Sequence, residues 1–170
     1  YRIDREIHAS KRTQVYKAVD TDTNNPVVIK TPSVNYEDEP SYIENFIHEE
    51  WIGKRIHNSR VLKIYKQTRP RQFLYYVTEY IDGQTLRNWM NVHSRPDIKE
   101  VRLIIEQIAT GLRAFHRLEM LHQDIKPENI MFREDGSVVL TDFGIAKSTS
   151  VDNKMTVTGT VIGTPHYMSP

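Results

Sequence analysis

The sequence predicts an α+β fold in two unequal parts, a strand-rich first part and a mainly helical second part. Up to about residue 81, short β-branched and aromatic runs alternate with turn formers, and one helical pattern interrupts them. After Asp82-Gly83, apolar residues recur at helical spacing. Hydrophobic residues make up 38% of the 170 positions and charged residues 26%, which is typical of a globular chain. We therefore expect two domains, 1–81 and 82–170.

In the first part, Ser41 and Glu44 fit a capping box, and apolar residues at helical spacing follow them. This pattern predicts a helix over residues 41–56. Turn-forming residues separate the β-branched and aromatic runs, so the first two runs predict a β-hairpin. The runs that we expect to form strands are 15–19, 27–30, 61–65 and 73–80.

In the second part, residues 86–92 are a short helix candidate. Asp97 and Glu100 fit another capping box at the start of a long helix that extends to Phe115, with apolar residues along one face. Two short β-branched runs then flank the turn Glu134-Asp135-Gly136, which predicts a second hairpin.

The composition excludes several classes of protein. The chain has no cysteine, which excludes a disulfide scaffold and thiolate metal sites and fits a reducing compartment. Its net charge of +1 gives no reason to expect a nucleic-acid partner. No apolar run approaches the roughly 18 residues that a membrane-spanning helix needs. The first residues do not form a signal peptide, so we expect a cytoplasmic location.

The densest polar cluster lies between the long helix and the second hairpin. It is the run His122-Gln123-Asp124-Ile125-Lys126-Pro127-Glu128-Asn129, and Asp142-Phe143-Gly144 follows at the end of a strand. Carboxylate and amide oxygens are ligands that Mg²⁺ prefers, and a lysine meets phosphate as a point charge. A carboxylate that is not bound to metal can deprotonate a hydroxyl group. The cluster therefore suits chemistry on metal-bound phosphate.

Taken in order with two further segments, this cluster resembles the eukaryotic-type protein kinase family. The segments are Val27-Val28-Ile29-Lys30 and Gly163-Thr164-Pro165-His166-Tyr167-Met168-Ser169-Pro170. Asp-Phe-Gly alone is a weak signal, but the ordered set is specific. The resemblance implies a bilobal kinase fold. Its antiparallel-sheet N-lobe with one main helix covers 1–81, and a truncated, mainly helical C-lobe covers 82–170.

A second resemblance is to the kinase part of bacterial bifunctional protein kinase/phosphatases. It rests on the run 75–86, on the phrase Leu121-His122-Gln123-Asp124 and on a first loop that is poor in glycine. It implies a possible linked phosphatase or other domain in the full protein.

The kinase resemblance also implies a role for each residue of the cluster. Asp124 resembles the aspartate that accepts the proton of the substrate hydroxyl, and Lys126 resembles the lysine that meets the transferring phosphate. Asn129 and Asp142 resemble the two Mg²⁺ ligands, and Lys30 resembles the strand lysine that holds the phosphates of ATP. Lys126 is the residue type found in Ser/Thr kinases.

The helix partner of Lys30 is expected to be Glu49, and Glu50 is the neighbour to exclude. Counting back from Val61-Leu62, which resembles the strand after this helix, favours Glu49. A slip of one residue would turn the side chain about 100° away from the site.

The same resemblance implies an adenine pocket and a substrate loop. Thr164 fits the loop that selects Ser/Thr substrates. Thr78 resembles the residue that guards the adenine pocket, and the backbone of the next residues would bind adenine. The residues expected at ATP are Val15, Val28, Lys30, Thr78, Glu79, Ile81, Asn129 and Asp142.

The first loop departs from the family pattern, because His8, Ser10 and Thr13 stand where three glycines are usual. Glycine permits positive φ and a close backbone approach to phosphate, so we expect a loop that is more open or shaped differently. Lys11 and Arg12 could compensate by charge, or they could be simply solvated.

Three other positions also depart from the family pattern. Val28 replaces a usual alanine and narrows the adenine pocket. Gln123 replaces an arginine, so activity should not depend on an ion pair with a phosphorylated activation loop. Gly53, inside the predicted helix, should cost about 1 kcal/mol of helix stability relative to alanine and leave Phe143 less supported.

We expect a Ser/Thr protein kinase that uses ATP and Mg²⁺ to phosphorylate protein substrates. One alternative is a pseudokinase, a nucleotide-binding module that regulates a linked domain. The other is an α/β interaction domain that no nucleotide stabilises.

Two further expectations concern the C-terminal part. Thr156, Thr158 and Thr160 are either autophosphorylation sites or members of an ordinary polar loop. Because the expected lower helices are missing, the isolated 170 residues should expose apolar side chains such as Ile104 and Ile108, and be poorly soluble or inactive.

Overall fold

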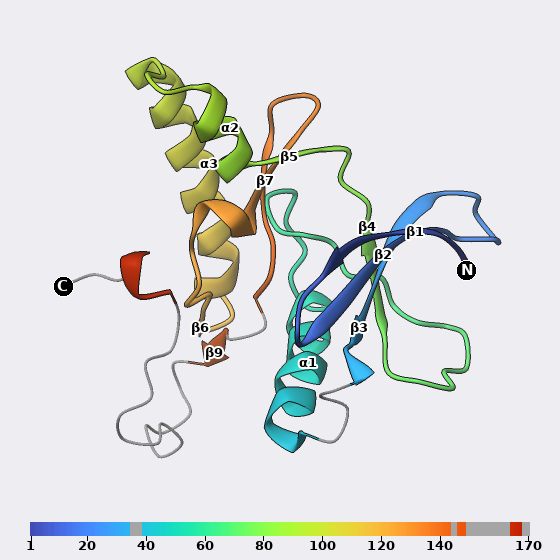
Figure 1. Cartoon of the computed structure of the whole chain (residues 1–170). Coiled ribbons are helices and arrows are strands. Elements are labelled where there is room, and N and C mark those ends of the chain that lie inside the picture. Colours follow the sequence, from blue (N-terminus) through green and yellow to red (C-terminus); the bar gives the residue numbers. More distant parts are fainter. Residues whose placement is uncertain (35–38, 144–145, 149–163, 168–170) are drawn as a thin grey trace. The chain divides into compact units, whose positions relative to one another are not determined.

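The computed structural model describes residues 1–34, 39–143, 146–148 and 164–167 (Figure 1). The chain forms two compact units. The first unit comprises residues 1–55 and 62–80, and the second comprises 56–61 and 81–170. The predicted α+β class is confirmed. Among the described residues, the first unit holds an antiparallel sheet with one helix, and the second holds two α-helices and short strands.

The first unit is built on a four-stranded antiparallel sheet with the order β1-β2-β3-β4 (Figure 1). Its strands are β1 (Arg2–Ala9), β2 (Thr13–Val19), β3 (Pro26–Pro32) and β4 (Tyr76–Glu79). The predicted hairpin is confirmed: β2 and β3 pair without a break from Thr13–Pro32 to Val19–Pro26. Asn24 in the connecting turn adopts a φ of 56°, which asparagine tolerates better than most residues.

The helix of the first unit is α1 (Pro40–Gly53), and it begins one residue earlier than the sequence predicts. The predicted capping box at Ser41 is wrong, because Glu39 is the N-cap and its side chain makes no capping hydrogen bond. Proline is pre-organised for the first helical position, where its missing N–H is not needed. Pro40 therefore sets the start of the helix. Gly53 is its last residue, so the expected cost of a glycine in a helix interior does not apply fully.

The predicted strand over 61–65 is wrong. Val61 makes an isolated parallel bridge to Leu140 in the second unit, and Ile64 makes an isolated antiparallel bridge to Thr78 in the first unit. The run is divided between two partners, so no continuous ladder forms. The strand predicted over 73–80 is reduced to the four residues of β4.

The two faces of the sheet are covered differently. On the face that carries Lys30, α1 packs through Phe46, whose ring lies 4.9 Å from that of Tyr76. The other face bears a separate core cluster that is closed by Tyr1 and Tyr65. The buried members of this cluster are Ala18, Val27, Ile29, Tyr75 and Val77. Because strand residues alternate between faces, Ile29 and Lys30 serve opposite sides of the sheet.

The second unit holds α2 (Leu86–Val92) and α3 (Ile98–His116). Both helices begin at a side-chain cap: Thr85 Oγ1 accepts from the Asn88 N–H at 3.1 Å, and an Asp97 oxygen accepts from the Lys99 N–H at 3.0 Å. The remaining elements are short. They are β5 (Gly83–Thr85), β6 (Met120–Leu121), β7 (Ile130–Arg133), β8 (Val138–Leu140), β9 (Lys147–Ser148) and the 3₁₀ turns Pro127–Asn129 and Pro165–Tyr167.

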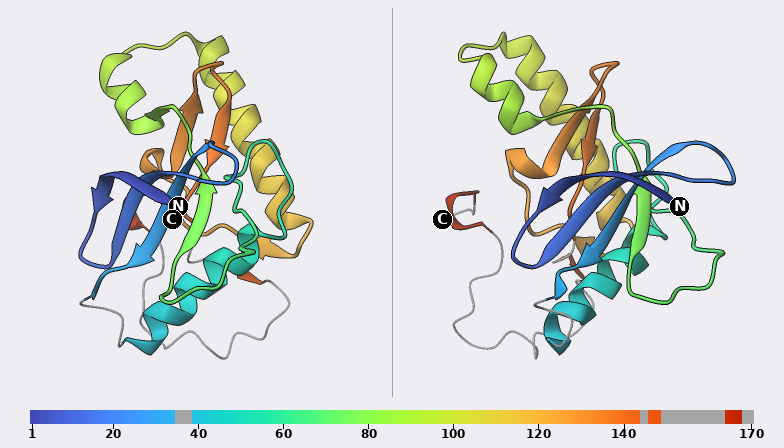
Figure 2. Two further views of the ribbon diagram at one scale, coloured as in Figure 1. Left: turned by 90° about the vertical axis from the view of Figure 1, so that its right-hand side faces the viewer. Right: turned by 45° about the vertical axis from the view of Figure 1, so that its right-hand side comes forward.

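Helix α3 runs along the β7–β8 hairpin in both views of Figure 2. Val138, Val139 and Leu140 of β8 are fully buried. Gly111 permits this close packing, because a Cβ there would lie 2.8 Å from Leu140 Cδ1 and 2.9 Å from the Arg60 carbonyl oxygen. Within the described residues, no helix is both long enough and apolar enough to cross a membrane.

Candidate active site

In the first unit, Lys30 forms an ion pair with Glu49. Its Nζ lies 3.0 and 2.9 Å from the two carboxylate oxygens of Glu49. Strand β3 presents the lysine and α1 presents the glutamate, whose side chain is only 6% exposed. The lysine also lies 5.6 Å above the ring of Tyr76. A lysine held in this way has a fixed position and a nearby counter-charge, which suits a phosphate-binding cation.

The neighbouring acid, Glu50, belongs to a different network. Arg71 donates to both of its oxygens, at 3.0 and 2.5 Å, and also to the carbonyl oxygen of Tyr75 at 2.8 Å. Lys54 Nζ lies 2.5 Å from Glu50 Oε1. Burial raises the pKa of Glu50, but the hydrogen bonds from Arg71 and Lys54 outweigh burial and lower it. Sequence reasoning missed Arg71, because no motif links it to the helix.

In the second unit, three side chains meet at the carboxylate of Asp124. Lys126 Nζ lies 2.7 Å from Oδ2, and the Asn129 amide nitrogen donates to Oδ2 at 2.9 Å. The Thr164 hydroxyl donates to Oδ1 at 2.6 Å, and Lys126 Nζ lies 3.3 Å from that hydroxyl. The structure thus brings together four residues that the sequence singles out, although 40 positions separate Asp124 from Thr164.

Local backbone structure explains this convergence. The 3₁₀ turn that begins at Pro127 folds the chain back, with the Asn129 N–H donating to the Lys126 carbonyl at 2.9 Å. The Thr141 N–H donates to the Asn129 carbonyl at 2.9 Å, so Asp142 follows a residue that is bonded to Asn129. Asp142 adopts a φ of 56°, a conformation that aspartate tolerates better than most residues.

Asn129 and Asp142 fit a role as Mg²⁺ ligands. The amide nitrogen of Asn129 donates to the backbone carbonyl and the carboxylate of Asp124, which leaves its amide oxygen as the ligand atom. Asn129 is 5% exposed and Asp142 is exposed. Among the described residues, no three His, Asp or Glu side chains gather as a metal site. The pair would therefore need phosphate oxygens and water to complete an octahedral shell.

His122 is a buried residue that supports the loop from Asp124 to Asn129. It is 2% exposed, and its ring lies 5.2 Å from that of Phe115 and 6.3 Å from that of Phe143. Its Nδ1 accepts a hydrogen bond from the Asp124 N–H at 3.4 Å. Burial lowers the pKa of His122, so the imidazole is neutral near pH 7 and acts as a packed support. Phe143 is fully buried, and its ring also lies 5.5 Å from that of Phe115.

The turn between β1 and β2 closes without glycine. Ser10 Oγ accepts hydrogen bonds from the backbone N–H groups of Arg12 at 3.2 Å and Thr13 at 2.9 Å. The Ser10 N–H in turn donates to the Thr13 carbonyl at 2.9 Å. No residue from His8 to Thr13 adopts a positive φ. Of the two shapes that the sequence left open, this is a differently shaped turn, and the serine hydroxyl occupies two of its backbone donors.

Four of the expected ATP-contacting residues share one face of the sheet. Val15 pairs with Lys30 across β2 and β3, and Val28 pairs with Thr78 across β3 and β4. Directly paired residues on adjacent strands project to the same face.

The other residues expected at ATP lie elsewhere. Glu79 donates its backbone N–H to the Lys63 carbonyl at 3.0 Å. Ile81 belongs to the second unit, as do Asn129 and Asp142. Thr156, Thr158 and Thr160 lie outside the described residues.

A comparison with models of known protein families shows to which family the chain belongs. The model described as the protein kinase domain matches residues 1–170. The chain belongs to the protein kinase family. The family resemblance of the sequence is thereby confirmed, together with the kinase-like fold.

Several bacterial protein kinases are similar to this chain along its full length. It is 33% identical over 170 residues to a probable serine/threonine-protein kinase of Clostridium acetobutylicum and covers 26% of that protein. It is 32% identical to the serine/threonine-protein kinase PrkC of Bacillus subtilis, again covering 26%. It is 29% identical to the serine/threonine-protein kinase PknL of Mycobacterium bovis, covering 42%. The chain therefore spans between a quarter and a half of these relatives' length.

Proposed function

We propose that this protein is a Ser/Thr protein kinase that transfers the γ-phosphate of ATP to Ser or Thr hydroxyls of protein substrates. The observation that carries the proposal is the environment of the Asp124 carboxylate. It accepts a hydrogen bond from a threonine hydroxyl at 2.6 Å, and a lysine ammonium lies 3.3 Å from the same hydroxyl. A substrate hydroxyl needs the same two partners, a base for its proton and a cation for the incoming phosphoryl group.

Each residue has a distinct task in this proposal. Asp124 orients the acceptor hydroxyl and takes its proton, and Asn129 holds the Asp124 carboxylate in place through its amide nitrogen. Lys126 stabilises the negative charge on the transferring phosphoryl group. Lys30, fixed by Glu49, holds the ATP phosphates. Bound Mg²⁺ would neutralise the triphosphate, and we assign its protein ligands to Asn129 and Asp142.

Phosphate transfer by the full-length protein tests the role of Asp124. Radiolabelled ATP with Mg²⁺ and a general acceptor such as myelin basic protein would report the rate. We expect Asp124→Asn to lower kcat by at least about 100-fold, because general base catalysis typically contributes that much. Asp135→Asn is the matched control, since it makes the same chemical change in the exposed turn of the β7–β8 hairpin. Equal rates for Asp124→Asn and the wild type would overturn the proposal.

A nucleotide-binding pseudokinase is the second candidate, and the turn closed by Ser10 is the observation that favours it. Two backbone N–H groups of that turn donate to the serine hydroxyl, which leaves them less available to bind phosphate. A pseudokinase would bind ATP, and 100 times Kd of ligand would add about 2.7 kcal/mol to the free energy of unfolding. Stabilisation by ATP without transfer would favour this candidate. No stabilisation would instead favour an interaction domain that binds no nucleotide.

The wider features of the protein are also proposals. We assign 1–81 to the nucleotide-binding N-lobe and 82–170 to the catalytic part of the C-lobe, in a protein that acts in the cytoplasm. Because the relatives are much longer than this chain, a further domain in the full protein is consistent with them. That this domain is a phosphatase stays a prediction, which the full gene sequence would test. The expected exposure of Ile104 is wrong, because this side chain is only 7% exposed. The low solubility expected of the isolated 170 residues stays a prediction.

A further inference from the structure

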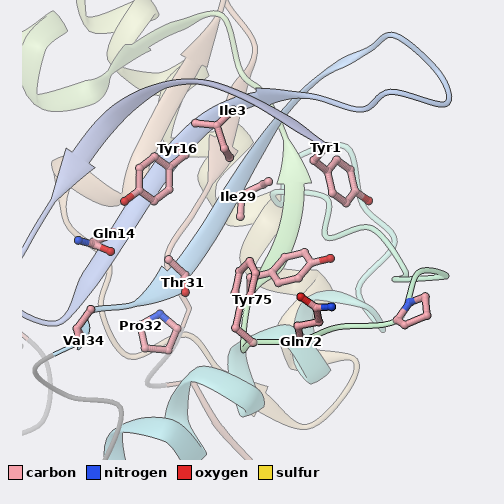
Figure 3. Close-up of a pocket in the computed structure, with 12 residues that line it drawn as sticks. Tyr1, Ile3, Gln14, Tyr16, Ile29, Thr31, Pro32, Val34, Gln72 and Tyr75 are labelled. Atoms are coloured by element: carbon pink, nitrogen blue, oxygen red, sulfur yellow. The ribbon is translucent and has the colours of Figure 1, made fainter.

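A pocket of about 550 Å³ lies on the face of the β1–β4 sheet opposite to Lys30 (Figure 3). Gln14 and Tyr16 line it from β2, and Ile29 and Thr31 line it from β3. Lys30 lies between the last two residues in sequence, so strand alternation directs it to the other face. The pocket belongs entirely to the first unit and is separate from the phosphate-binding lysine.

The pocket has a buried floor and an exposed apolar rim. The floor is made of Ile29, Pro32 and Tyr75. The rim is made of Ile3, Val34 and Phe73, which are 50%, 73% and 64% exposed. Apolar side chains that remain in water around a hollow gain free energy when a ligand covers them. The volume falls within the range of about 300–1,000 Å³ that is usual for small-molecule sites.

Among the described residues, no charged side chain lines this pocket. Twelve residues form its walls, and all of them are apolar, aromatic, amide-bearing or hydroxyl-bearing. Charged residues make up 26% of the chain, so about three of any twelve would be charged on average. The nearest cations, Arg69 and Arg71, lie over the rings of Tyr1 and Tyr75 but are already paired with carboxylates. A ligand charge would therefore lose its hydration here without meeting an unpaired counter-charge, which is costly. The lining therefore selects an uncharged ligand.

Aromatic rings and two free amides define the shape of that ligand. The Tyr75 ring lies 5.1 Å from Phe73 and 6.4 Å, edge-on, from Tyr1, and such clusters favour another planar ring. Gln14 and Gln72 lie on opposite sides of the pocket in Figure 3. Within the described chain, neither side-chain amide has a hydrogen-bond partner. Each can both donate to and accept from a ligand amide or carbonyl group.

We propose that this pocket is a second ligand site, which binds an uncharged, planar aromatic molecule bearing an amide or carbonyl group. The rings of the ligand pack against the tyrosines and Phe73 over the floor formed by Ile29. Its polar group bonds Gln14 or Gln72. The proposal does not depend on phosphotransfer, because every residue that it uses lies on the face away from Lys30.

Binding of naphthalene carboxamide to the full-length protein tests the chemistry of the pocket. Saturation-transfer NMR, with excess ATP and Mg²⁺ to occupy the nucleotide site, would give its Kd. Naphthoate is the matched anion, with the same rings. We expect the carboxamide to bind at least about ten-fold more tightly than naphthoate. No binding of the carboxamide, or equal binding of the two probes, would overturn the proposal.

Two aspartate variants of β1 test the location of binding. Ile3 lines the pocket and is 50% exposed, whereas Ile7 does not line it and is 43% exposed. We expect Ile3→Asp to weaken carboxamide binding by about ten-fold or more and Ile7→Asp to leave it unchanged.

Phe73→Ala gives a second readout if Ile3→Asp fails to fold. This side chain is 64% exposed, so the fold tolerates its loss, and we expect binding to weaken several-fold as one ring contact disappears. Wild-type affinity in both Ile3→Asp and Phe73→Ala would place the probe elsewhere and contradict the proposal.

Discussion

At the residue scale, the two adjacent glutamates of α1 show how one helix can serve two purposes. Glu49 pairs with Lys30 on the sheet, and Glu50 pairs with Arg71 and Lys54. Adjacent helix residues project about 100° apart, so each acid reaches a different partner. Because Arg71 also donates to the Tyr75 carbonyl, Glu50 links α1 to the segment before β4. This link fixes the rotation of the helix that presents Glu49.

Removal of Arg71 should therefore destabilise the first unit. Arg71→Ala leaves a mostly buried carboxylate with Lys54 alone, and because Arg71 is a quarter exposed we expect a modest loss of about 1–2 kcal/mol in the free energy of unfolding. Urea denaturation would measure it. Arg95→Ala is the control, because this exposed arginine should change stability by less than about 0.5 kcal/mol. If the two variants are equally stable, the link does not contribute.

At the element scale, the turn between β1 and β2 can be tested for its use of backbone donors. Ser10→Ala and Ser10→Gly both remove the hydroxyl that binds the N–H groups of Arg12 and Thr13. Only glycine adds the freedom to adopt positive φ and approach phosphate closely. We expect Ser10→Gly to bind ATP more tightly than Ser10→Ala, by a few-fold, in calorimetric titration of the full-length protein. Equal affinities would mean that backbone freedom in this turn does not limit ATP binding.

A substitution at Gly111, where α3 packs on β8, should have two opposing effects on stability. Gly111→Ala should gain about 1 kcal/mol of helix propensity, but its Cβ would lie 2.9 Å from a backbone carbonyl that cannot move cheaply. Overpacking of this kind costs about 1–3 kcal/mol, so we expect a net destabilisation in thermal or urea unfolding.

Ala109→Gly provides the reference for this substitution. Ala109 is exposed on the same helix, and its replacement should cost about 1 kcal/mol by propensity alone. If the clash dominates, the two opposite substitutions both destabilise the protein. A more stable Gly111→Ala variant would show that β8 and the segment at Arg60 relax to accept the methyl group.

At the scale of the whole molecule, sequence patterns predicted the elements that local chemistry determines. The β2–β3 hairpin and α3 follow from strong periodicity, and the Asp97 cap follows from its side chain. The segment 61–65 has the same β-branched character, yet its strand was predicted wrongly because its partners lie in two different units.

The functional residues differ in the same way in how well the sequence predicts them. Asp124, Lys126 and Asn129 are close in sequence, so a motif could identify them together. Arg71 and the pocket beside Ile29 depend on contacts between distant segments. No local pattern encodes such contacts, so sequence reasoning could not find them.

The buried histidine of the second unit makes the stability of the protein depend on pH. Burial lowers the pKa of His122 in the folded state, whereas in the unfolded chain it titrates near its ordinary value of 6.5. Below that pH the unfolded state binds more protons than the folded state, so acid favours unfolding. The free energy of unfolding should therefore be independent of this group above about pH 7. It should fall as the pH drops from 6.5 towards the lowered pKa.

Urea denaturation of the wild type and two variants between pH 7.5 and pH 5 would measure this dependence. His122→Gln removes the buried imidazole, so this variant should be less stable at pH 7 but lose less stability on acidification. His8→Gln, at an exposed position of β1, should retain the pH dependence of the wild type. Parallel pH profiles for His122→Gln and the wild type would contradict this account. The loss of stability in acid would then come from other groups, such as His48, whose pKa burial also lowers.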